Sequence, residues 1–301
     1  MKNFPLFSSM HTHTIFCDGK DDVETMCSAA YKKNLYAIGF SAHAPVEKQI
    51  GIKSDWHLKD ENAGLYIEEI LNAKKKWEGK LEVYLGYEVD YIKGRRSPLD
   101  TDITALNLDY IIGCVHYIFP ENGAEPFTID GSMLEFEKGL KEGFNGDYEA
   151  LMHFYYDSVA EMIKEGGFDI LGHADLIKKN CLGKNYWPQE SELKRQKEIA
   201  NLAKDKNIVF EVNTGGINRK KINEVYPSLQ FLRFIKECNI PVIITSDAHK
   251  ADDINGNYDT AINTLICANF NKHAIFKGKI NKNPIWQDEK IIKNKYNFLA
   301  C

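Results

Sequence analysis

Short apolar segments rich in β-branched residues alternate along the chain with longer amphipathic segments. The short segments predict buried strands, and the longer ones, whose apolar residues recur at helical spacing, predict helices. Seven strands are expected, at residues 4–10, 36–40, 81–85, 110–115, 168–171, 208–212 and 242–245. Helices are expected at residues 23–32, 62–77, 148–165, 190–205, 228–238 and 258–268. Such alternation is typical of βα units on a parallel sheet and places the chain in the α/β class.

Two stretches do not follow this alternation. Residues 119–147 contain two prolines and five glycines, which predict a long loop with one short helix. A loop of this length on a compact domain is often a lid over a site. Residues 270–301 mix lysine, asparagine and apolar residues in a pattern that predicts no element. Because no linker-like segment divides the chain, we interpret residues 1–301 as a single domain, a length that α/β barrels commonly reach.

Histidine or an acidic residue follows nearly every predicted strand. The motifs are HTHTIFCDG at 11–19, SAHAP at 41–45, GYEVD at 86–90, GCVH at 113–116, GHAD at 172–175, EVNTGG at 211–216 and SDAH at 246–249. Because residues two apart on a strand share a face, His11 and His13 present both imidazoles to one point. In a parallel barrel the carboxyl ends of all strands open on one rim, so the other motifs are expected to converge on this pair.

Such a convergence of donors predicts a metal centre at the carboxyl-terminal rim. A single histidine at a strand end is more often a solvated or packed residue, but that interpretation does not explain why six of the nine histidines occupy such positions. The expected ligands are His11, His13, Asp18, His43, Glu88, His116, His173, Asp247 and His249. This set exceeds the coordination shell of one ion and predicts two or three divalent ions with a bridging carboxylate. Imidazole and carboxylate without thiolate suit zinc, manganese or iron.

The remaining histidines and the cysteines are given no ligand role. His57, His153 and His273 occupy predicted loops or helices, and we expect them to be surface or substrate-facing groups. The seven cysteines have irregular spacing and no CxxC pair, which argues against a disulfide framework or a zinc-thiolate site. Cys17 and Cys114 are therefore interpreted as packing residues.

The charge of the chain narrows its possible partners. A formal net charge of −5 gives no long-range attraction for a polyanion, so nucleic acid is disfavoured, although a local site for one phosphate stays possible. No apolar segment approaches the roughly 18 residues of a membrane span. We therefore expect a cytoplasmic protein, a monomer or homodimer, that acts on a small molecule and not at a membrane.

In their order and spacing these motifs resemble those of the polymerase and histidinol phosphatase (PHP) superfamily, and within it the histidinol-phosphatases. The resemblance extends from His11 to His249 and includes GHADLIKK at 172–179 and TSDAH at 245–249. It implies a distorted (β/α)7 barrel with a trinuclear metal centre. The implied reaction is hydrolysis of L-histidinol phosphate to L-histidinol and phosphate, in histidine biosynthesis, by a hydroxide that bridges the metal ions.

The same resemblance distributes the ligands among three ions. His11, His13, Glu88 and Asp247 would hold the first; Glu88, His116 and His173 the second; and Asp18, His43 and His249 the third, with Glu88 as the bridge. Two departures stand out. Cys17 occupies a position that is often small and polar in the family, and Arg219 lies about one residue beyond the usual place of the arginine.

Phosphate hydrolysis also requires groups that bind the substrate. Arg219 is the first candidate for the phosphate, with Lys178 or Lys179 as weaker ones. Asp247 or His249 could protonate the leaving oxygen, and the sequence does not favour either. The amine and imidazole of histidinol phosphate could be received by acidic residues of the 119–147 loop, namely Glu121, Glu125 and Asp130.

Two other kinds of function are compatible with the motifs. The chain could be a PHP-type phosphodiesterase, an exonuclease or a phosphotyrosine phosphatase, although its negative charge argues against nucleic acid. It could also be a metal-stabilised binding module without catalysis. A complete ligand set argues against that alternative, since loss of catalysis is expected to remove ligands first.

Overall fold

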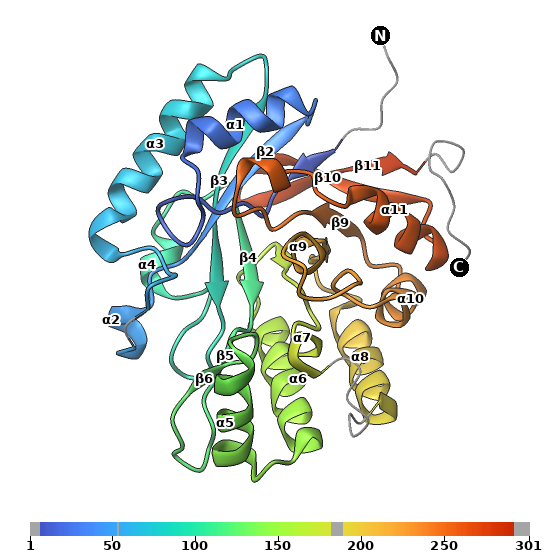
Figure 1. The fold of residues 1–301 in the computed structure, drawn as a ribbon. Helices are drawn as coiled ribbons and strands as arrows, with labels where there is room; N and C mark the ends of the chain where they lie inside the picture. Colours follow the sequence, from blue (N-terminus) through green and yellow to red (C-terminus); the bar gives the residue numbers. More distant parts are fainter. Residues whose placement is uncertain (1–6, 53, 182–188, 292–301) are drawn as a thin grey trace.

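The computed structural model describes residues 7–52, 54–181 and 189–291. Its centre is a parallel sheet of seven strands, in the order β1-β2-β3-β4-β7-β8-β9 (Figure 1). These strands are β1 (Ser8–Ser9), β2 (Ala37–His43), β3 (Glu82–Asp90), β4 (Tyr110–Cys114), β7 (Ile170–Leu171), β8 (Val209–Asn213) and β9 (Val242–Thr245). Each overlaps a predicted strand; of the first prediction, residues 4–6 lie outside the described part of the chain.

The sheet closes on itself just beyond its two edge strands. Thr12 and Ala248, which follow β1 and β9, form an isolated parallel bridge. His13 N donates to the Ala248 carbonyl at 2.9 Å, and Ala248 N donates to the His11 carbonyl at 3.1 Å. Closure therefore occurs at the carboxyl ends of the strands, where the metal-ligand motifs lie. The prediction of a distorted (β/α)7 barrel is confirmed.

Helices surround the barrel and agree with the predictions to within two residues. The long ones are α1 (Val23–Lys32), α3 (Ala63–Lys76), α6 (Tyr148–Glu165), α8 (Gln189–Ala203), α10 (Leu229–Glu237) and α11 (Tyr258–Cys267). Asp22, Asp147 and Ser228 cap the amino ends of α1, α6 and α10 by accepting backbone N–H bonds. Short helices are α2 (Glu47–Ile50), η1 (Asp60–Asn62), α4 (Thr101–Thr104), α7 (Lys178–Cys181), α9 (Gly215–Asn218) and η2 (Ala251–Asp253). No helix in the described ranges is long and apolar enough to span a membrane.

The segment expected to be a long loop is more ordered than predicted. Strands β5 (Tyr117–Ile118) and β6 (Phe127–Thr128) pair antiparallel, and α5 (Met133–Phe144) follows. Gly139 lies inside α5, where an added Cβ would come within 2.3 Å of the Phe127 ring. This glycine allows α5 to pack closely on the hairpin, so the stretch holds a 12-residue helix where only one short helix was expected. Movement of the segment as a lid stays a prediction.

A hairpin that the sequence did not predict lies near the C-terminus. Strands β10 (Lys272–Ile280) and β11 (Asn283–Lys290) pair antiparallel, and Ala274 and Phe276 pack in one cluster with barrel residues such as Tyr110 and Ile243. The turn residues Asn281 and Lys282 have φ angles of 51° and 66°. Such a turn is usually marked by Asn-Gly, and the lysine removes that signal from the sequence.

His273 at the start of this hairpin should make stability depend on pH. Its buried ring stacks on Phe7 with centroids 5.5 Å apart, and burial lowers the pKa of His273 from 6.5 to about 4. As pH falls through this window, the unfolded chain binds a proton that the folded chain does not, which lowers the free energy of unfolding by up to about 3 kcal/mol. Above the unfolded pKa the penalty vanishes.

We therefore expect His273→Phe to lose less stability on acidification than the unchanged protein, by roughly 2 kcal/mol. Denaturant unfolding at about pH 7 and about pH 4.5, with a chelator present throughout, measures this difference. His153→Phe is the matched control, since the side chain of His153 is 44% exposed on α6. Equal pH dependence in the His273 and His153 variants would contradict the prediction.

Candidate metal centre and active site

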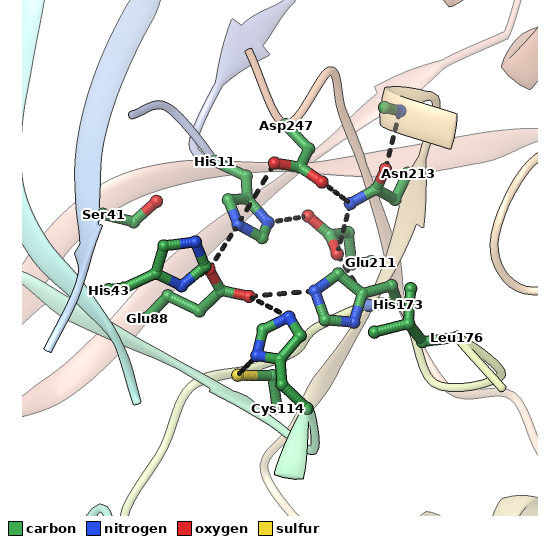
Figure 2. A network of polar contacts seen from close by, with 12 residues as sticks. His11, Ser41, His43, Glu88, Cys114, His173, Leu176, Glu211, Asn213 and Asp247 are labelled. Carbon is green, nitrogen blue, oxygen red and sulfur yellow. Dashed lines mark hydrogen bonds and ion pairs between the residues drawn. The ribbon is translucent and has the colours of Figure 1, made fainter. Parts of the chain in front are cut away.

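Glu88 lies at the centre of the predicted ligand set. It is fully buried on β3, and its two carboxylate oxygens face different groups of imidazoles (Figure 2). Oε1 lies 2.9 Å from His173 Nε2 and 3.7 Å from His116 Nε2. Oε2 lies 3.1 Å from His11 Nε2, 3.6 Å from His13 Nε2 and 2.9 Å from His43 Nδ1. A carboxylate placed in this way can bridge two ions.

Two further carboxylates, Asp247 and Asp18, complete the cluster. Asp247 Oδ1 lies 3.3 Å from His13 Nε2 and 3.5 Å from His249 Nδ1. Asp18 Oδ2 lies 3.0 Å from His249 Nε2, and its Oδ1 lies 3.7 Å from His43 Nε2. All nine residues predicted as ligands are thus brought to one place, although they come from strand ends up to 238 positions apart, from His11 to His249.

The donor atoms fit divalent metal ions. Four groups of predicted ligands have donor atoms within 4.8 Å of one another: His13, Asp18, His43 and His249; His11, His13 and Glu88; His11, His173 and Asp247; and His43, Glu88 and His116. Several of these atoms are buried and make no hydrogen bond with the described residues, among them His11 Nε2, His13 Nε2, His43 Nδ1 and Glu88 Oε2. Because buried polar atoms almost always make hydrogen bonds, several imidazole nitrogens without one around a buried carboxylate indicate a cation site.

A cavity of about 600 Å³ opens above these ligands. Arg219 lines it and donates from Nη2 to Asp247 Oδ2 at 2.9 Å. Glu125 and Asp130 also line the cavity. Lys179, in contrast, is paired with Asp130 at 3.2 Å.

Two residues predicted to contact the substrate lie away from this cavity. Lys178 Nζ is buried against Asp175 at 3.1 Å and Glu224 at 2.9 Å. Glu121 lines a separate small groove beside α6. The structure therefore assembles Arg219, Glu125 and Asp130 around the cavity, and it does not bring Lys178 or Glu121 there.

A known family model matches most of the chain, including the first six strand-end motifs up to Gly215. The sequence model of the PHP domain matches residues 9–215, from the histidine pair after β1 to the first glycine after β8. The chain belongs to the PHP domain family. The histidinol-phosphatase of Bacillus subtilis is 26% identical over 262 residues, covering 83% of this chain and 96% of that protein. A Deinococcus radiodurans protein named "Probable histidinol-phosphatase" is 27% identical over 256 residues, covering 85% of this chain and 91% of that protein.

Solved structures of similar fold exist. The crystal structure of hisK from Listeria monocytogenes superposes with a TM-score of 0.73 at 25% identity, covering 84% of this chain and 99% of that one. A second structure is histidinol phosphate phosphatase (HisK) from Lactococcus lactis, crystallised with zinc, L-histidinol and phosphate. It superposes with a TM-score of 0.65 at 18% identity, covering 92% of this chain and 99% of that one. The fold of this PHP domain is therefore shared over almost the full length of both proteins.

Glu211 is a buried acid in contact with the predicted ligands, and the sequence did not reveal it. It is fully buried on β8, and its Oε1 lies 2.5 Å from His11 Nδ1 (Figure 2). It also accepts hydrogen bonds from His173 N at 2.7 Å and Thr245 Oγ1 at 2.6 Å. A carboxylate on Nδ1 fixes the His11 tautomer and leaves Nε2 for a metal ion. An acid inside a strand-end motif was the available signal.

Asp90 has the corresponding role for His116. It lies two residues after Glu88 on β3, and its Oδ1 accepts hydrogen bonds from His116 N at 3.1 Å and Nδ1 at 2.9 Å. Burial would raise the pKa of Asp90, but His116 and His57 hold it far below its ordinary range. Burial would lower the pKa of His116, but Asp90 and Glu88 raise it to about 10. The buried carboxylates around His116 therefore favour a positive charge at this position.

The predictions for the other histidines were only partly right. His57 is buried and hydrogen-bonded to Asp90, so its interpretation as a surface or substrate-facing group was wrong. His273 is also buried, in the hairpin cluster at the opposite end of the barrel. His153 is on the surface of α6, where it pairs with Glu149 at 3.8 Å.

The backbone is strained at two of the ligands. His173 and Asp247 follow β7 and β9 with φ angles of 20° and 48°, values that residues with a Cβ rarely adopt. Asp247 also packs closely on Gly215, since a Cβ on this glycine would lie 2.7 Å from Asp247 Oδ2. The first glycine of the EVNTGG motif therefore makes room for a ligand, and backbone strain of this kind is common at functional sites.

Proposed function

We propose that the chain is a metal-dependent phosphomonoesterase that hydrolyses L-histidinol phosphate to L-histidinol and phosphate in the cytoplasm. The observation that carries this proposal is the bridging position of Glu88, between two groups of histidines on the floor of a cavity that Arg219 lines. The names of the relatives from Bacillus subtilis and Deinococcus radiodurans support the substrate.

The centre would hold two or three divalent ions, with zinc, manganese and iron as candidates. His11, His13, Glu88 and Asp247 would bind one; Glu88, His116 and His173 another; and Asp18, His43 and His249 a third. Divalent ions of this kind lower the pKa of a bound water and neutralise phosphoryl oxygens. Glu211 and Asp90 hold the rings of His11 and His116 in the orientation that the ligands require.

Arg219 would bind the phosphate. Its guanidinium lies at the cavity wall, and the side chain is 34% exposed. Burial would lower the pKa of Arg219, but the Asp247 carboxylate raises it. The guanidinium is therefore permanently charged and held in place by Asp247 Oδ2 at 2.9 Å and the Asp247 carbonyl at 3.1 Å. A planar fork of donors next to the metal ligands suits the transferred phosphoryl group.

Other residues that line the cavity suit the cationic leaving group. Trp56 and Tyr117 line it with stacked rings whose centroids are 5.5 Å apart. Asp55 and Glu125 also line it, and neither makes a hydrogen bond or ion pair within the described residues. Asp130, in contrast, is already neutralised by Lys179. Aromatic faces and unpaired carboxylates together attract an amine and an imidazole.

Product release from a panel of substrates tests the proposal: phosphate from the monoesters, p-nitrophenol from the diester and nucleotides from oligonucleotides. The purified protein, with its metal content measured by elemental analysis, is expected to hydrolyse L-histidinol phosphate with a kcat/KM at least about a hundredfold above that for bis(p-nitrophenyl) phosphate, oligonucleotides or phosphotyrosine peptides. Hydrolysis of the diester or of oligonucleotides, with histidinol phosphate untouched, would replace the monoesterase proposal with the phosphodiesterase alternative. A fully metal-loaded protein inactive on all four would favour the binding module.

A further inference from the structure

A chain of buried hydrogen bonds connects a predicted metal ligand to a loop that no motif includes. His116 Nδ1 lies 2.9 Å from Asp90 Oδ1, and Asp90 Oδ2 lies 2.9 Å from His57 Nε2. His57 Nδ1 in turn lies 2.7 Å from Ser54 Oγ. All four residues are at most 6% exposed, so water does not compete for these bonds.

The directions of these hydrogen bonds follow from what each atom can donate. Asp90 only accepts, so His57 carries a proton on Nε2 and His116 one on Nδ1. Ser54 Oγ already accepts from the backbone N–H groups of Trp56 and His57, both at 3.3 Å, which uses its two lone pairs. Ser54 must therefore donate to His57 Nδ1, and His57 is a neutral imidazole with one defined tautomer.

We infer that His57 is a positioning residue of the metal centre, which acts on His116 through Asp90. With Oδ2 bound to His57 and Oδ1 bound to His116, the Asp90 carboxylate cannot rotate away from the ligand. His116 therefore keeps its proton on Nδ1 and directs Nε2 toward Glu88 Oε1, 3.7 Å away. This inference rests on the proposed function for its kinetic readout only.

The chain of bonds also reaches the wall of the substrate cavity. Trp56, whose N–H is bound by Ser54, packs edge-on against His43 with centroids 4.6 Å apart. Residues 54–57 thus include both His57, which supports a predicted ligand, and Trp56, which lines the cavity. These contacts hold the segment in a defined position although it has no regular secondary structure.

Two amide variants separate the two hydrogen bonds of His57. In His57→Gln the amide nitrogen can occupy the place of Nε2 and still donate to Asp90. In His57→Asn the shorter amide reaches Ser54 but not Asp90. We expect His57→Asn to weaken retention of one ion roughly tenfold to a hundredfold and to lower kcat on histidinol phosphate by a similar factor, with KM changed less than about threefold. His57→Gln should stay within about threefold of the unchanged protein in both readouts.

Metal retention is measured by elemental analysis after dialysis against graded chelator concentrations, and kcat and KM by phosphate release. His153→Asn, at the exposed surface of α6, is the matched control and should change neither quantity. Thermal unfolding in excess chelator identifies variants that fail to fold. If His57→Asn is among them, Asp90→Asn, which keeps the side-chain shape but replaces one of the two acceptor oxygens by an amide donor, is expected to show the same loss.

Equal losses in His57→Gln and His57→Asn would overturn the inference, since the ring and not its bond to Asp90 would then be what matters. Full retention of metal by His57→Asn would overturn it as well. Metal retention needs no substrate, so a protein that leaves histidinol phosphate intact would refute the proposed function and still decide this inference.

Discussion

Replacing Glu88 by glutamine is expected to remove at least one ion per chain and to lower kcat/KM for histidinol phosphate roughly a thousandfold. The side chain is fully buried, and its two oxygens face different imidazoles, with Oε2 2.9 Å from His43 Nδ1 and Oε1 2.9 Å from His173 Nε2. Glutamine keeps the shape but loses the negative charge that a bridging position requires. Loss of about 4 kcal/mol of charge stabilisation in the transition state corresponds to this factor.

Elemental analysis and phosphate release measure the two effects of Glu88→Gln. Glu82→Gln is the matched control, because Glu82 lies on the same strand but is exposed at its beginning. The unchanged protein after chelation sets the lower limit of activity, and readdition of manganese, zinc or iron should restore it. A Glu88→Gln protein with its full metal content and unchanged kcat/KM would eliminate the bridging role.

Replacing Arg219 by alanine is expected to lower kcat/KM by roughly a hundredfold to a thousandfold while the ions are retained. Such a loss is typical when one preorganised donor to the transition state is removed. The kcat/KM of Arg219→Lys should lie between those of Arg219→Ala and the unchanged protein. An ammonium keeps the charge but cannot reproduce the contacts from both Nη1 and Nη2 to Asp247. Steady-state kinetics with histidinol phosphate measures the loss.

The metal content of Arg219→Ala is measured as well, and a substitution of a distant arginine is the control. Arg233→Ala, on the exposed face of α10 where its partner is Gln230, should leave the kinetics unchanged. If Arg219→Ala lost metal as well as activity, the arginine would act by supporting Asp247 and not by binding phosphate. Unchanged KM and kcat in Arg219→Ala would remove it from the site altogether.

The sequence predicted the fold well because the signals for its main elements are local. Helices α1 and α6 begin after the capping residues Asp22 and Asp147, and each has a continuous apolar face. The hairpin of β10 and β11 escaped prediction because Asn281-Lys282 lacks the glycine that usually marks such a turn. Its burial depends on contact with the end of the barrel, a non-local interaction.

The metal ligands were predictable for a related reason. A histidine or acid directly after an apolar strand is visible in the sequence, and parallel strands bring such positions to one rim. The supports of these ligands were not predictable in this way. Glu211 contacts His11 across 200 positions, and His57 contacts Asp90 across 33 from a loop without a motif. Nothing in the local pattern says which buried acid faces which ring.

The sequence by itself determined the βα order, the strand ends that carry donors and the nine residues that converge. Only the tertiary structure decided how each imidazole is oriented, that Glu88 faces two groups of ligands, and that Lys178 is directed at Asp175 and not at the cavity. The physical reason is that a residue's type and its place on a strand are local properties. Tautomer, hydrogen-bond partner and charge are set by groups that meet only when the barrel closes.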